Sequence, residues 1–133
     1  MPGVMFSKPG RVVEWQHGAI MLAIGLVLMW PEQTMVGPLF DPLVNLMSEK
    51  AWAALLFVMG VVRCAALVVN GLAPRGSPLA RMAVSLMAAP VWALVAYAFW
   101  LAAPVGLWAA AVYAVLAGFE IKIMWAAARD LKG

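Results

Sequence analysis

The stretch VMGVVRCAALVVNGLAPRG, residues 58–76, places one arginine, Arg63, inside an apolar run long enough to lie within a lipid bilayer. Hydrophobic residues make up 66% of the 133-residue chain and charged residues only 11%. A soluble protein of this size has too little interior to bury so much apolar surface. The composition therefore predicts an all-α integral membrane protein in which Arg63 needs a partner inside the membrane.

Prolines and polar residues divide the chain into four apolar segments, each near the length of about 20 residues that crosses a hydrocarbon core. Pro31 ends the first segment, and Pro104 separates the third from the fourth so closely that these two form a tight hairpin. The sequence thus predicts a four-transmembrane-helix bundle in a single domain, residues 1–133. The expected spans are approximately 12–30, 51–70, 78–103 and 105–127.

The first span has one alternative, a cleaved signal peptide with Lys8 and Arg11 as its basic region and residues 18–30 as its apolar region. Signal cleavage needs small residues after the apolar region. The bulky, polar sequence WPEQTM, residues 30–35, stands there instead. A retained membrane anchor is therefore favoured.

Basic residues predict the orientation of the bundle. The segment between the first two spans holds Lys50 against three acidic residues, Glu32, Asp41 and Glu49, whereas the other ends of the spans are basic. Cytoplasmic segments of membrane proteins are enriched in lysine and arginine, so both termini are expected in the cytoplasm (N-in/C-in). The basic residues at these ends are Lys8, Arg11, Arg75, Arg81, Arg129 and Lys132. The tryptophans expected at the outer interface are Trp30, Trp52, Trp100 and Trp108.

The outer loop, residues 31–52, contains the signals of a short helix. Asp41-Pro42 is a favourable helix start, and Leu43, Leu46 and Met47 would share one face with Lys50. We expect a short amphipathic helix that leads into the second span. It would act either as an elbow in the membrane interface or as a plug that binds a partner.

Arg63 and Glu120 each lie seven residues from the inner end of their span. At 1.5 Å per residue both are about 10 Å from the inner interface, so they are expected to form an intramembrane charge pair. Such a pair would fix the order and register of the helices. Alternatively, it would serve as a gate, a proton-linked carboxylate or a site for a partner's charge, since intramembrane charges are often functional.

Further polar residues are predicted to gather near the inner interface. This polar cluster comprises Glu14, His17, Arg81, Ser85 and Lys122. Lys122 lies about 200° around its helix from Glu120 and is expected to extend toward the lipid headgroups. His17 is either an interfacial hydrogen-bonding group or a switch that titrates near neutral pH.

A stripe of small residues marks the fourth span, at Gly106, Ala110, Ala114 and Gly118. Small residues allow helices in membranes to approach closely. The stripe is expected either to pack inside the bundle or to contact another copy of the protein.

Signatures of catalysis and cofactor binding are missing from the sequence. One cysteine and one histidine build no metal site alone, and neither a phosphate-binding glycine loop nor a nucleophile elbow is present. We expect no enzyme and no cofactor. The net charge of +3 follows from topology, so it predicts anionic lipid at the cytoplasmic face as a partner and not nucleic acid.

Three classes of function fit these features. The outline of a very small polytopic protein with a basic tail resembles the holins of tailed phages, which implies a self-associating protein that permeabilises the inner, or cytoplasmic, membrane of a bacterium. An accessory or anchoring subunit of a larger membrane complex is the alternative. A small secondary transporter is third: the chain is similar in size to small multidrug transporters, but Glu14 is nearer the interface than their working carboxylate.

The charge asymmetry makes a testable prediction. Reporter domains fused at Lys8 and at Gly133 are expected to be active in the cytoplasm, and a reporter inserted near Thr34 is expected outside, because the basic segments stay inside. Reporter activity on opposite sides for Lys8 and Gly133 would mean an odd number of spans and would overturn the arrangement.

Overall fold

The computed structural model describes residues 9–72 and 77–132, and this part of the chain is helical without any strand. Four of its helices are long and apolar enough to cross a membrane, which confirms the all-α fold and the four apolar helices expected from the sequence. Lys8 and Arg75, used above to predict orientation, lie outside the described residues. The helices are α1 (Pro9–Leu28), α2 (Asp41–Leu46), α3 (Glu49–Leu72), α4 (Ser77–Leu101) and α5 (Leu107–Lys132).

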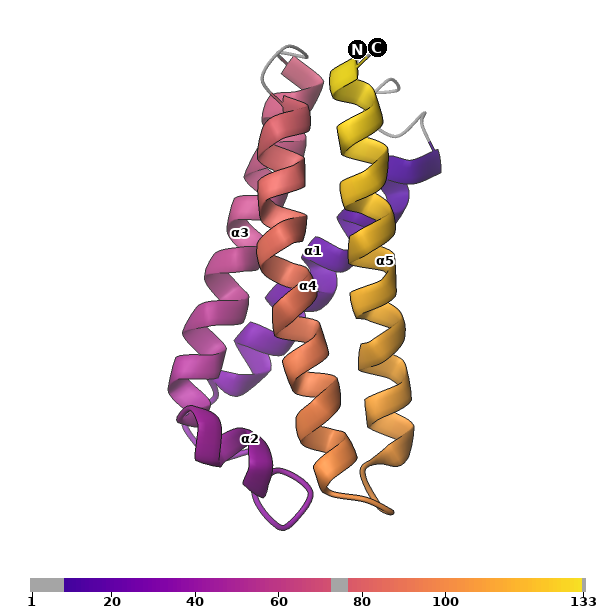
Figure 1. Ribbon diagram of the computed structural model, residues 1–133. Coiled ribbons are helices and arrows are strands. Elements are labelled where there is room, and N and C mark those ends of the chain that lie inside the picture. The colour runs from indigo at the N-terminus through magenta and orange to yellow at the C-terminus, as the bar shows by residue number, and fades with distance from the viewer. Residues whose placement is uncertain (1–8, 73–76, 133) are drawn as a thin grey trace.

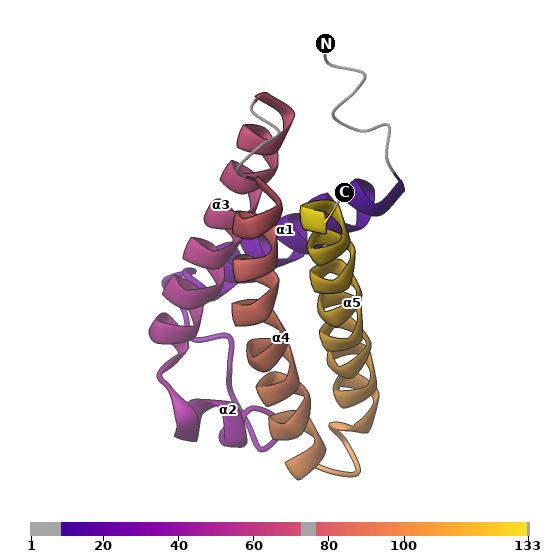
Figure 2. The same ribbon diagram turned by 45° about the horizontal axis from the view of Figure 1, so that its top comes forward.

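The long helices form two closely packed pairs. Helix α1 packs along α3, α4 packs along α5, and α3 against α4 provides most of the contact between the pairs. Figures 1 and 2 show that α1 begins at the end of the bundle where α5 ends, which we call the terminal end. Helix α2 and the turn between α4 and α5 lie at the opposite end, the loop end. Helix α1 crosses the others obliquely and meets α5 at only a few positions.

The helix boundaries follow local sequence. Helix α1 begins at Pro9, a residue favoured in the first turn because it lacks the N–H that would stay unbonded there. Helix α5 extends beyond the expected end at residue 127, because alanine and other good helix formers continue to Arg129 and Lys132, and basic residues are favourable at a helix C-terminus. Pro90 lies inside α4, as is tolerated in transmembrane helices.

The surface of the bundle is mainly apolar, whereas its interior contains several charged side chains. Large hydrophobic side chains such as Leu94, Val115 and Phe119 are exposed, while several charged side chains are buried. An apolar surface of this extent is stable only in contact with lipid or with other proteins. This distribution fits a multi-pass membrane protein.

Two charged side chains order the loop between α1 and α3. Glu49 accepts hydrogen bonds from the backbone N–H and the hydroxyl of Thr34, at 2.9 and 2.5 Å, while Lys50 Nζ donates to the backbone oxygens of Leu28 and Trp30, at 3.0 and 2.5 Å. The positive charge of Lys50 thus satisfies carbonyl groups left unbonded at the end of α1. These contacts hold the loop against the start of α3.

A short helix, α2, stands in the loop, and the apolar residues expected on one of its faces lie in different environments. Helix α2 has only 6 residues, and Met47 behind it is extended, with φ −150° and ψ 152°. Leu43 is buried, but Leu46 is 51% exposed. Trp52, expected at the interface, is also buried, and its indole N–H donates to the oxygen of Leu43 at 2.9 Å. The short helix therefore anchors to the bundle through Leu43.

Helices α1 and α3 approach each other closely at two glycines that the sequence analysis did not single out. A Cβ atom on Gly25 would lie 2.8 Å from the backbone nitrogen of Phe57, and one on Gly60 would lie 2.9 Å from Leu22 Cγ. Lipid supplies no hydrophobic drive between helices, so their association depends on such close packing.

We therefore expect Gly25→Ala to lower the free energy of unfolding by about 1–3 kcal/mol, because the new methyl group meets backbone and not a flexible side chain. Unfolding in mixed detergent micelles, followed by circular dichroism, measures the change. Gly118→Ala is the matched control, because a Cβ at Gly118 meets nothing within 4 Å. Equal stability of both variants would contradict the close α1–α3 contact.

Candidate functional site

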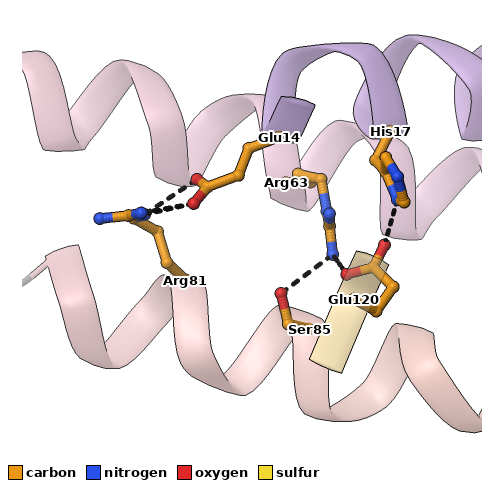
Figure 3. Close-up of polar contacts among 6 residues, drawn as sticks. All are labelled: Glu14, His17, Arg63, Arg81, Ser85 and Glu120. Carbon is orange, nitrogen blue, oxygen red and sulfur yellow. Dashed lines mark hydrogen bonds and ion pairs between the residues drawn. The ribbon is translucent and has the colours of Figure 1, made fainter. Parts of the chain in front are cut away.

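Apart from Glu49 in the loop, the buried charged residues of the described chain lie toward the terminal end of the bundle, and Glu120 is the centre of the first group. Arg63 Nη2 donates to Glu120 Oε2 at 2.6 Å, and His17 Nδ1 lies 2.8 Å from Glu120 Oε1. Arg63 Nη2 also lies 3.4 Å from the hydroxyl of Ser85. Figure 3 shows these side chains converging from four helices: His17 from α1, Arg63 from α3, Ser85 from α4 and Glu120 from α5. Glu120 is fully buried, so its charge is compensated by these partners alone.

A second group lies beside the first, around Arg81. Its Nε donates to both carboxylate oxygens of Glu14, at 2.8 and 3.1 Å, and Nη2 makes a further short contact with Glu14. Arg81 Nη1 donates to Asp130 Oδ2 at 3.0 Å. Glu14 and Arg81, whose paired side chains are drawn in Figure 3, are buried, whereas the Asp130 side chain is 46% exposed. The fork of the guanidinium thus ties α1 and α5 to α4.

The direction of the bond between His17 and Glu120 depends on the tautomer of the imidazole. A Glu120 carboxylate paired with Arg63 accepts this bond from His17 Nδ1–H, which the imidazolium and one neutral tautomer both carry. The ring of Phe119 packs edge-on against His17, with ring centroids 6.0 Å apart.

Of the two buried arginines, Arg63 has more N–H donors without a hydrogen-bond acceptor among the described residues than Arg81. The Nε and Nη1 atoms of Arg63 have no hydrogen-bond acceptor among the residues that the structure describes. A buried donor without an acceptor costs about 1–3 kcal/mol. Within the same part of the chain, no group of three or more His, Cys, Asp and Glu side chains is placed to hold a metal ion.

The loop half of the bundle is apolar and aromatic. A cavity of about 210 Å³ lies there, lined by Trp52, Trp92, Phe99 and Tyr113 among others. The rings of Trp92 and Phe99 both stack on Tyr113, with centroids 5.5 and 5.4 Å apart. The charged groups of the cluster do not extend into this aromatic region, so the described side chains of a single copy do not form a polar path from one end of the bundle to the other.

The structure joins most, but not all, of the residues expected in the polar cluster. Glu14, His17, Arg81 and Ser85 are buried within it, together with Arg63 and Glu120. Lys122 is exposed and takes no part in the ion pairs of the described residues. Asp130 belongs to the cluster although it was not expected there.

Helical periodicity could have identified Asp130. Ten residues rotate a helix by about 1,000°, or about 80° short of three full turns, so Asp130 lies at the edge of the face that carries Glu120. Ile123 and Ala127, between them, are both buried on that face. The expected span ended at residue 127, before the face reached Asp130.

The small-residue stripe of α5 is divided between two environments. Ala110 is 8% exposed, and a Cβ atom on Gly106 would overlap the carbonyl oxygen of Phe99, so these two residues pack against α4. Ala114 and Gly118 are exposed. Four residues turn a helix by about 400°, so a four-residue repeat drifts by about 40° at each step and moves off the packed face.

No protein-family model matches the chain, and no curated protein or solved structure is detectably similar to it. The fold and the cluster by themselves define a class: a protein with four apolar helices long enough to span a membrane, linked by buried ion pairs.

The charge pair can be tested by a double-mutant cycle. Arg63→Leu and Glu120→Leu are each expected to lower the free energy of unfolding by about 3–5 kcal/mol, because each leaves a buried charge without its partner. The double variant is expected to lose at least about 1 kcal/mol less stability than the sum of the two single losses. Unfolding in mixed micelles measures all three values.

The control for this cycle is Lys122→Leu, which removes an exposed charge two residues from Glu120 and is expected to change stability by no more than about 0.5 kcal/mol. Strict additivity of the two single losses would show that Arg63 and Glu120 do not stabilise each other.

Proposed function

We propose that this protein is a non-enzymatic, multi-pass protein of a bacterial cytoplasmic membrane that associates with copies of itself and permeabilises the bilayer, as a phage holin does. Both termini would lie in the cytoplasm, in agreement with the basic residues at the terminal end. The observation that supports this proposal most is the exposed small-residue surface of α5 at Ala114 and Gly118.

A single copy offers little basis for transport. Its charged cluster is satisfied mainly by internal ion pairs, and its loop half is apolar and aromatic. A transporter needs a binding site that opens to each side in turn, with polar groups along the path. A permeability pathway would therefore arise between several copies, which favours the holin-like function over the transporter.

The surface around Ala114 and Gly118 suits contact between helices. Gly118 has open space where a side chain would stand, and the neighbouring Val115 is 58% exposed. A helix of a second copy could approach this surface closely, and close backbone approach is what stabilises helix pairs in lipid. Ala110, on the packed face, is not part of this surface.

The proposal predicts separate effects for the two halves of the stripe. Replacing Ala114 and Gly118 together by Ile is expected to abolish cross-linked oligomers in membranes while the protein remains folded, because the added atoms separate the helices. Ala110→Ile is expected to reduce the amount of folded protein instead, because this position is packed against α4.

Membrane potential provides the functional readout. Wild-type protein expressed in bacteria is expected to depolarise the inner membrane above a threshold level, and the Ala114→Ile, Gly118→Ile variant is not. Val62→Ile on the exposed face of α3 is the control and should behave as wild type. A normal potential at high wild-type expression would refute permeabilisation and leave the accessory subunit as the better hypothesis.

A further inference from the structure

Two basic side chains of the terminal end lie outside the ion-pair cluster. Lys122 and Arg129 are exposed on α5, and neither takes part in the ion pairs among the described residues. They are seven residues apart, which places them on the same face of the helix about 10 Å apart along its axis. Both line a hollow of about 380 Å³ between α5 and α1, together with Val13 and Phe119.

An apolar groove continues from this hollow toward the loop end. The groove has a volume of about 760 Å³ and lies between α1 and α5, where the two helices have few contacts. Val13 and Phe119 line both spaces, so the hollow and the groove adjoin each other. Ile20, Val112 and Leu116 continue the apolar lining.

The dimensions of this surface match those of a lipid. From Lys122 to Val112 the hollow and the groove together follow α5 for ten residues, or about 15 Å at 1.5 Å per residue. Half the thickness of a hydrocarbon core is also about 15 Å. Lys122 and Arg129 thus lie at one end of an apolar surface. The length of this surface is similar to the thickness of the hydrocarbon region of one leaflet.

We propose that the groove between α1 and α5 binds one acidic phospholipid. Lys122 and Arg129 hold its phosphate, and an acyl chain lies along Phe119, Leu116 and Val112. The Glu14 carboxylate also lines the hollow, but it is paired with Arg81, and the two basic groups Lys122 and Arg129 give the hollow a positive charge that favours an anion. This inference is independent of the proposed permeabilising function.

A lipid fits the groove better than a helix of a second copy. A partner helix would need a free acidic side chain at the level of Lys122 and Arg129. The acidic residues of the described chain near that level are Glu14, Glu120 and Asp130, and all three are already paired within their own copy. A lipid phosphate supplies the missing negative charge.

Binding is tested with the full-length protein in detergent micelles, using native mass spectrometry with added phosphatidylglycerol or phosphatidylcholine of the same acyl chains. Wild-type protein is expected to retain one phosphatidylglycerol with about tenfold or greater preference over phosphatidylcholine, because two basic groups contact the headgroup. The double variant Lys122→Gln, Arg129→Gln is expected to lose this preference.

Two matched pairs of variants separate a built site from general attraction. Lys122→Gln and Lys132→Gln remove the same charge from the same helix, but Lys132 does not line the hollow, so only the former should weaken phosphatidylglycerol binding. Ala111→Phe narrows the groove and should reduce binding of the lipid, whereas Val62→Phe, on the exposed surface of α3, should not.

Several results would overturn the proposal. Equal retention of the two lipids by wild-type protein would show that the groove does not select an acidic headgroup. Equal losses for Lys122→Gln and Lys132→Gln would show a diffuse charge effect. Dimers that disappear with Ala111→Phe but not with Val62→Phe, without selective lipid binding, would identify the groove as a protein interface.

Discussion

The bundle depends on one compensation: the negative charge of Glu120, fully buried on α5, is matched by Arg63 on α3 and by a hydrogen bond from His17 on α1. The same contacts connect the two helix pairs, α1 with α3 and α4 with α5. Apolar packing has little preference for one helix order in lipid, since the helices leave one apolar environment for another. The buried charges have such a preference, because any other arrangement leaves one of them without a partner.

The charged half and the aromatic half of the bundle therefore have different roles. Toward the terminal end, ion pairs to Glu120 and Glu14 fix the register of the helices. Toward the loop end, stacked aromatic rings and the bonds of Glu49 and Lys50 hold the connecting loop in place. The separation leaves no polar path through the described part of one copy, and the proposed function therefore relies on interactions with lipid and with other copies.

Such interactions would use two neighbouring surfaces of α5. One is the exposed part of the small-residue stripe, at Ala114 and Gly118, and the other is the groove toward α1 with Lys122 and Arg129 at its end. Their positions on one helix would allow a bound lipid to influence how copies associate. The two surfaces adjoin at Val115, which is exposed beside Ala114 and also lines the groove.

The sequence by itself determined the class and the outline of the fold. Its apolar composition and the breaks at Pro31 and Pro104 define four helices, and equal distances from the helix ends place Arg63 and Glu120 at one depth, because length along a helix is a direct measure of depth. Only the tertiary structure decided which helix faces meet. In the tertiary structure His17 is the second partner of Glu120, and Asp130 contacts Arg81. The small-residue stripe of α5 is packed at Ala110 and exposed at Ala114 and Gly118. Rotation and crossing of helices depend on all neighbouring side chains at once, so no single segment encodes them.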